Sequence, residues 1–150
     1  MQPTKNPELA SPSTLAWWSC PGIVYFLVVG NPPIAVKIGM LAITSKVTLQ
    51  SAMARRLSNI QSSNHELVQV IGVIHFIKGE YPTRDAENCE RRLHLDFEHL
   101  VRFKAGTRGA EWFNASPALL ERISQVAVLP ESLGLPRTVG AIIARQANEA

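Results

Sequence analysis

Two apolar runs separated by a proline-containing turn constrain the fold of this chain more than any other feature. Residues 23–29 form a continuous run rich in β-branched side chains, which is typical of a central strand. Neither a strand nor a helix can cross Gly30-Asn31-Pro32-Pro33, so residues 34–40 are expected to return beside the first run as a β-hairpin. Tyr25 stands inside the first strand, where valine or phenylalanine would serve a purely apolar core. Its phenol is therefore a candidate functional group.

The periodic segments after the hairpin predict a small α/β or α+β domain. The hairpin is followed by an expected helix over about 48–61, a strand at 67–77 and a helix over about 84–100. Ser116-Pro117 then has the cap and first-turn proline that open a third helix. This order predicts an α/β fold with a small, three-stranded, mainly antiparallel sheet flanked by helices.

The chain of 150 residues is long enough for one domain with an ordinary core. Residues 1–20 carry three prolines and no periodicity, so we expect a flexible N-terminal arm. Residues 21–128 form the predicted domain, and 129–150 form a C-terminal extension that contains a short helix. Trp17 and Trp18 either cover an open edge of the core or offer a surface on which bases or a partner protein can dock.

Composition limits the classes of partner and compartment. The net charge of +3 and the sequence pI of about 9.1 are compatible with a polyanionic partner but do not establish one. No apolar run approaches the ~18 residues of a membrane helix, and no signal-peptide pattern is present, so we expect a cytoplasmic protein with no membrane partner. Cys20 and Cys89 are expected to be reduced thiols, and their spacing predicts no zinc site.

Five motifs follow one another in a fixed order along residues 22–123. They are Gly22-Ile23-Val24-Tyr25-Phe26-Leu27, Lys37-Ile38-Gly39, Arg55-Arg56-Leu57, Glu90-Arg91-Arg92-Leu93-His94-Leu95-Asp96-Phe97 and Glu111-Trp112-Phe113. In this order they resemble the phage-associated branch of the GIY-YIG endonuclease superfamily. The resemblance implies a GIY-YIG nuclease-like fold, DNA as the partner, and an endonuclease that uses Mg²⁺ or Mn²⁺ to hydrolyse phosphodiester bonds.

The resemblance also implies roles for three residues. Phosphodiester hydrolysis requires an attacking water, a group that takes its proton and positive charge on the phosphate. Tyr25 matches the tyrosine proposed to deprotonate the water, although its phenol can equally be a hydrogen-bonded core side chain. Arg56 matches the arginine that binds the reacting phosphate, for which a guanidinium fork is well suited. Glu90 matches the metal-binding carboxylate; the alternative is an exposed helix face of i,i+4 ion pairs.

Other charged residues are candidate members of the same site. Lys37 stands where the family name places a second tyrosine, and it either holds a phosphate oxygen or is a solvated strand-end residue. His94 lies one helical turn after Glu90 and can support the site. Arg55 precedes Arg56, and either of these two can be the phosphate ligand, with Arg56 preferred. A basic loop is expected to contact the nucleic-acid backbone through Arg102, Lys104 and Arg108.

The same residues permit a second interpretation, in which the GIY-YIG-like fold is kept without catalysis. Such a chain would be a DNA-binding or protein-interaction module. Lysine in place of the second tyrosine and the small number of basic residues motivate this alternative. Salt-dependent DNA binding without cleavage under any divalent metal would distinguish it from the enzyme.

Overall fold

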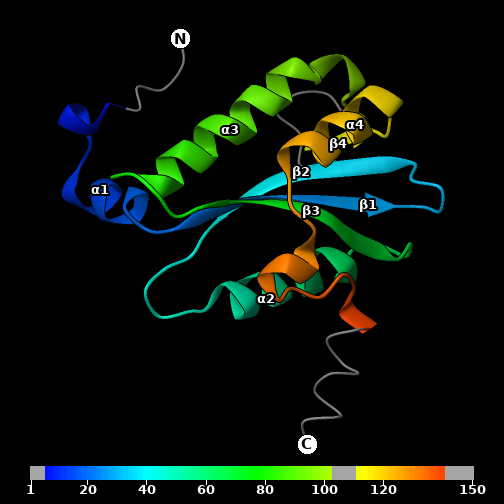
Figure 1. Cartoon of the computed structure of the whole chain (residues 1–150), viewed down its shortest axis with the longest axis horizontal. Helices are drawn as coiled ribbons and strands as arrows, with labels where there is room; N and C mark the ends of the chain where they lie inside the picture. The colour runs from blue at the N-terminus through cyan, green and yellow to red at the C-terminus, as the bar shows by residue number, and fades with distance from the viewer. Residues whose placement is uncertain (1–5, 103–110, 141–150) are drawn as a thin grey trace, which may run out of the picture.

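The protein is an α/β domain built on a four-stranded antiparallel sheet, seen in a computed structural model that describes residues 6–102 and 111–140 (Figure 1). The strand order across the sheet is β3-β1-β2-β4. The strands are β1 (Gly22–Val29), β2 (Ala35–Ala42), β3 (Val68–Phe76) and β4 (Trp112–Asn114). The antiparallel sheet flanked by helices agrees with the sequence prediction, whereas the predicted number of three strands is wrong. β4 has only three residues, too few to produce a recognisable alternation, and it joins the sheet by pairing with the distant β2.

The predicted hairpin is present as β1 and β2, which pair along their whole lengths from Gly22↔Ala42 to Val29↔Ala35. Gly30 opens the turn with a φ of 93°, a conformation that side chains with a Cβ rarely adopt. Within this register, Tyr25 of β1 lies directly opposite Gly39 of β2. The two sequence motifs that flank the turn are therefore cross-strand neighbours.

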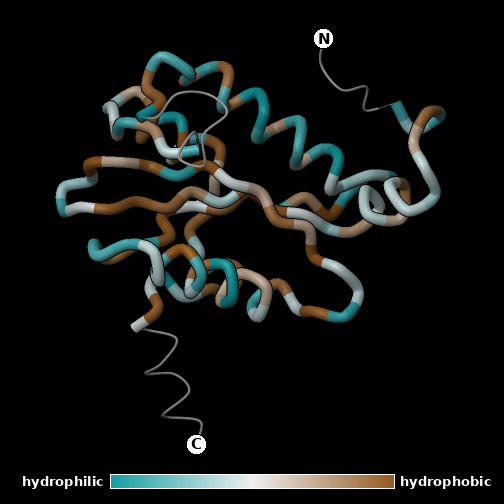
Figure 2. Tube along the Cα trace, turned by 180° about the vertical axis from the view of Figure 1, so that it is seen from behind, coloured by the Kyte–Doolittle hydropathy of each residue, from teal (hydrophilic) through white to brown (hydrophobic). Residues whose placement is uncertain are grey.

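Helices cover both faces of the sheet, with α2 (Leu49–Ser62) on one side and α3 (Pro82–Asp96) with α4 (Pro117–Val126) on the other (Figure 1). β1 is consequently buried on both faces, and its side chains alternate between two cores. The core under α3 and α4 includes Val24, Phe26 and Val28. The core under α2 includes Ile23, Tyr25 and Leu27. Figure 2 shows the hydrophobic residues concentrated in the strands between the helical layers, while much of α3 is hydrophilic.

The helices α2 and α4 begin where side-chain caps satisfy their first amides, whereas α3 begins at Pro82 without a side-chain cap. Thr48 and Ser51 form a reciprocal capping box at the start of α2, and Ser116 caps α4 just before Pro117. The periodicity of α2 buries Met53 and Leu57 against the sheet. This places position 56 at the border of the buried face.

The N-terminal segment contains secondary structure that the sequence analysis did not predict. Ser11 caps α1 (Pro12–Trp18), which follows the short 3₁₀ helix η1 (Pro7–Leu9). Trp18 is buried and packs edge-on against Tyr81, with ring centroids 6.1 Å apart, whereas Trp17 is 39% exposed. Trp18 thus has the core-covering role considered for it, while a docking role for Trp17 stays a prediction. Seven residues are too few for helical periodicity to reveal α1.

The chain after α4 crosses to the α2 side of the sheet along the edge of β3. Val128 pairs with Val73, and the backbone N–H of Val70 donates to the carbonyl of Arg137. The 3₁₀ helix η3 (Pro130–Leu133) precedes Leu135, which is buried in the core under α2. Residues beyond 129 therefore pack on the domain as far as Val139, and most of the predicted C-terminal helix lies outside the described residues. Another 3₁₀ turn, η2 (Glu98–Leu100), follows α3.

Within residues 6–102 and 111–140, no helix combines the length and the apolarity needed to cross a bilayer.

Candidate active site

The side chain of Tyr25 projects from β1 towards α2 and is completely buried. Its ring lies across the backbone of Gly39 on the neighbouring strand. A Cβ built at Gly39 would stand 2.4 Å from both Cζ and the phenolic oxygen of Tyr25, far inside van der Waals contact. Only glycine at position 39 therefore permits the phenol to reach this position, which gives a physical reason for the paired tyrosine and glycine in the hairpin.

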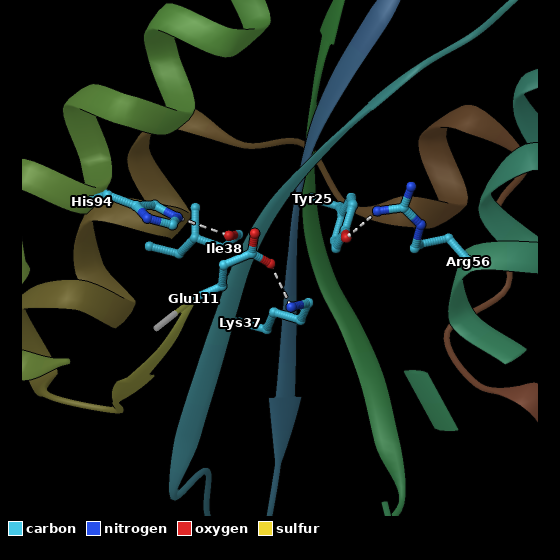
Figure 3. A network of polar contacts seen from close by, with 6 residues as sticks. All are labelled: Tyr25, Lys37, Ile38, Arg56, His94 and Glu111. Carbon is cyan, nitrogen blue, oxygen red and sulfur yellow. Dashed lines mark hydrogen bonds and ion pairs between the residues drawn. The ribbon is translucent and has the colours of Figure 1, made fainter. Parts of the chain in front are cut away.

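Arg56 of α2 contacts the phenol directly (Figure 3). Its Nη1 donates a hydrogen bond of 3.1 Å to the Tyr25 oxygen, and its Cζ lies 5.9 Å from the centre of the ring. Because a guanidinium can only donate, the phenolic oxygen accepts this bond and its own proton remains available to another acceptor. Arg55 is exposed and makes no hydrogen bond or ion pair with a described residue. Of the two arginines, Arg56 is the one joined to Tyr25.

The charges around Tyr25 act in opposite directions on its pKa. Burial is the largest influence and raises the pKa above its ordinary value of 10.0. The charge and hydrogen bond of Arg56 lower the pKa, whereas the negative charges of Glu111 and Glu90 raise it. The phenol is therefore protonated at neutral pH, and both carboxylates lie close enough to influence it.

Lys37 is engaged with a residue that the sequence analysis did not assign to the site. Its Nζ lies 2.6 Å from a carboxylate oxygen of Glu111 and 5.8 Å from the ring centre of Trp112. The Lys37 side chain is only 12% exposed, so the possibility of a solvated strand-end lysine does not hold. The signal available for Glu111 was its position as the first residue of the Glu-Trp-Phe motif.

His94 provides the hydrogen-bond partner of a backbone carbonyl at the edge of β2. The N–H of Ile38 donates to the carbonyl of Glu111 at 3.1 Å, where the pairing with β4 ends. The Ile38 carbonyl accepts instead from Nε2 of His94, at 2.9 Å. A carbonyl only accepts, so Nε2 carries a hydrogen in this arrangement. The imidazole also packs edge-on against Phe113, with centroids 5.0 Å apart, which fixes its orientation.

These contacts place three polar pairs around β2. Figure 3 shows Arg56 approaching from α2 on one side of the strand and His94 from α3 on the other, with Lys37 and Glu111 between them. β4 pairs with Ala35–Lys37, so the stretch Gly39–Ala42 has no described strand on its outer side. Residues from both helical layers can therefore meet at this part of the β2 edge.

Glu90 lies on α3, half-buried and one turn before His94. Among the described residues there is no group of three or more histidine, cysteine, aspartate or glutamate side chains arranged to hold a metal ion. A cation held at Glu90 would take water and substrate oxygens among its ligands. Hard oxygen ligands of this kind suit Mg²⁺ or Mn²⁺, which often keep several waters in protein sites. The donor chemistry of Glu90 is compatible with such an ion.

Of the three basic residues predicted in the loop, Arg102 lies among the described residues. Arg102 is exposed, and its Nη1 donates to the side-chain oxygen of Asn114, the last residue of β4, at 2.8 Å. Lys104 and Arg108 lie outside the described residues. The predicted residues that gather around the β2 edge are Tyr25, Lys37, Arg56, Glu90 and His94.

Comparisons of the chain with protein-family models, with curated proteins and with solved structures gave no match.

Proposed function

We propose that this protein is a metal-dependent DNA endonuclease of the GIY-YIG type. The observation that carries the proposal is the hydrogen bond between Tyr25 of β1 and Arg56 of α2, within the electrostatic reach of Glu90. A phenol, a guanidinium and a carboxylate can together handle the water proton, bind the phosphate and hold a cation in phosphodiester hydrolysis. They come from three separate elements, which supports a shared role over chance proximity along one helix.

Arg56 is the phosphate ligand in this proposal. Its guanidinium is half-buried, forms no ion pair with a described carboxylate, and lies between the buried phenol and a solvent-open pocket beside α2. A phosphate that binds Arg56 would draw the guanidinium away from the Tyr25 oxygen, because a charged phosphate is a stronger acceptor than a neutral phenol. Substrate binding would thereby give the attacking water access to Tyr25.

Tyr25 handles the proton of the attacking water. Its raised pKa means that the phenol starts protonated, so it would first orient the water as a hydrogen-bond donor, and it would take the proton of the water only after losing its own proton to solvent. Glu90 would hold the divalent cation, which would supply positive charge to the reacting phosphate and oppose the raising effect of the carboxylates on the Tyr25 pKa. His94 and the Lys37–Glu111 pair keep the β2 edge in position around these groups.

The second candidate function is a DNA-binding or protein-interaction module without catalysis. The complete burial of Tyr25 and the engagement of Lys37 by Glu111 favour it, since both withdraw a polar group from solvent. A buried phenol hydrogen-bonded to arginine is also compatible with a purely structural role.

Incubation of the purified protein with single-stranded, duplex and branched DNA separates the two functions. Each DNA is tested with Mg²⁺, with Mn²⁺ and with a chelator, and both strand scission and binding are measured. The endonuclease proposal expects metal-dependent scission that is lost in Tyr25→Phe and retained in the matched variant Tyr81→Phe. Binding without scission under both metals would favour the module.

A further inference from the structure

A small pocket opens beside the candidate active site, between the end of β2 and α2. Its volume is about 210 Å³. The lining residues are Leu41, Ala42, Val47, Ala52, Arg55, Arg56 and Asn59. Arg56 lines the pocket and also contacts the phenol of Tyr25, so the pocket adjoins the candidate active site.

The positive charge of this pocket is not neutralised by described carboxylates. Arg55 makes no ion pair or hydrogen bond with a described residue, and the Arg56 hydrogen bond goes to a neutral phenol. The sequence from Leu9 to His65 contains no aspartate or glutamate, so α2 and the loop before it cannot supply one. Elsewhere, arginines such as Arg122 and Arg137 pair with a carboxylate. Two guanidinium groups without acidic partners at one pocket indicate an anionic ligand.

The geometry of α2 assigns the two arginines to different anions. Consecutive helical residues point about 100° apart, so Arg55 and Arg56 cannot both direct their forks at one phosphate without distortion. Arg56 is directed to Tyr25, while Arg55 is exposed at the rim. Asn59 lies one turn after Arg55 and adds an amide donor, and the aliphatic wall formed by Ala42 and Val47 suits the apolar face of a sugar.

We propose that this pocket is a second phosphate subsite, in which Arg55 and Asn59 hold the backbone phosphate next to the one bound at Arg56. The proposal rests on the function proposed above, and it identifies the substrate of that site as a polynucleotide strand that is gripped at two consecutive phosphates. Two-point attachment would fix the direction of the strand and hold the reacting phosphate against Tyr25.

The test is DNA binding in a chelator, where no cleavage takes place. A labelled oligonucleotide is titrated with wild-type protein, Arg55→Ala and Arg92→Ala over a series of salt concentrations. Arg92 is the control, because it is also an exposed helical arginine but lies on α3, on the other face of the sheet, where Asp96 neutralises it. Arg55→Ala is expected to bind about tenfold more weakly, with a salt slope smaller by about 0.9 for duplex or about 0.7 for single-stranded DNA. An Arg55→Ala titration that matches Arg92→Ala in affinity and slope would overturn the subsite.

Further measurements distinguish a backbone phosphate from a free nucleotide, and failure of the subsite from failure of the proposed function. If a deoxynucleoside monophosphate binds as tightly as the oligonucleotide, the pocket is a site for free nucleotides and the backbone proposal is wrong. If the Arg55 effect on binding is found but no DNA is cut with Mg²⁺ or Mn²⁺, the subsite stands and the endonuclease function fails. If DNA is cut while Arg55→Ala binds like the control, the function stands and the subsite fails.

Discussion

The ring of Tyr25 occupies the space that a side chain at Gly39 would need. Because a Cβ at Gly39 would lie 2.4 Å from Cζ of Tyr25, Gly39→Ala must displace the ring from its contact with Arg56. We expect this variant to lose about 1–3 kcal/mol of the free energy of unfolding, as overpacked cores do, and to lose DNA cleavage. Urea denaturation measures the first effect and a gel assay the second.

The control for Gly39→Ala is Gly140→Ala, where the nearest atom would be 3.8 Å from the new Cβ. A double-mutant cycle with Tyr25→Leu makes the test specific, since Gly39→Ala should cost less when the ring has been removed. Equal costs in the two backgrounds would show that the ring and the glycine are not coupled.

Removal of Arg56 should raise the pKa of Tyr25 further. Arg56 lowers this pKa through its charge and its hydrogen bond, so Arg56→Ala leaves burial and the two glutamates unopposed. Tyr25 and Tyr81 are the only tyrosines, and a Tyr81→Phe background therefore makes phenolate absorbance specific for Tyr25. Circular dichroism at each pH restricts the comparison to folded protein. Arg55→Ala should leave the titration unchanged, and an Arg56→Ala midpoint at or below the wild-type value would contradict the contact.

Tyr25 should make the folded protein less stable at alkaline pH. Its pKa is above 10.0 in the folded state, so the unfolded chain loses this proton first as the pH rises. The contribution of Tyr25 to the free energy of unfolding is then constant below pH 10.0. Above pH 10.0 this contribution falls by up to about 1.4 kcal/mol per pH unit, until the pH reaches the pKa of the folded state.

Urea unfolding at several pH values measures this dependence as the difference between Tyr25→Phe and its parent. Both proteins carry Tyr81→Phe, because the pKa of Tyr81 is also raised. The loss of stability above pH 10.0 should be smaller in Tyr25→Phe. If the free energy of unfolding falls equally in the two proteins above pH 10.0, Tyr25 has the same pKa in the folded and unfolded states.

Much of the fold follows from local patterns in the sequence. The continuous apolar run explains β1, which is buried on both faces, and apolar positions three and four residues apart explain the buried face of α2. The order of the motifs also brought together Tyr25 and Arg56, which the structure places in contact. The strand and the helix depend on patterns among residues that are close in the sequence, whereas the contact between Tyr25 and Arg56 spans 31 positions and was indicated by the order of the motifs.

The parts that the sequence did not reveal depend on contacts between distant segments. β4 exists because it pairs with β2, and its three residues have no pattern of their own. Lys37 and Glu111 are separated by 74 positions, so only the completed sheet shows that they are partners. The pocket at Arg55 likewise requires the end of β2 and the loop at Val47 to close against α2.

Glu111→Gln should lower the pKa of Tyr25 relative to the wild type. The substitution keeps the shape of the side chain and removes a negative charge that raises this pKa. It also weakens the ion pair with the mostly buried Lys37, with an expected loss of about 1 kcal/mol of unfolding free energy. The phenolate titration described for Arg56→Ala measures the shift, and Glu121→Gln on α4 is the matched control. If Tyr25 has the same pKa in the two glutamine variants, Glu111 does not influence the phenol.

The rate of DNA cleavage by Glu90→Gln, measured against Mg²⁺ concentration, tests the endonuclease account most directly. Glutamine keeps the shape of the side chain but removes the charge that would hold the cation. The thermal midpoint and chelator-state DNA binding are measured in parallel to show that the variant is folded and binds normally. The account predicts metal-dependent cleavage by the wild type and a rate at least about 100-fold lower for Glu90→Gln. Equal rates for the two proteins at every Mg²⁺ concentration would contradict it.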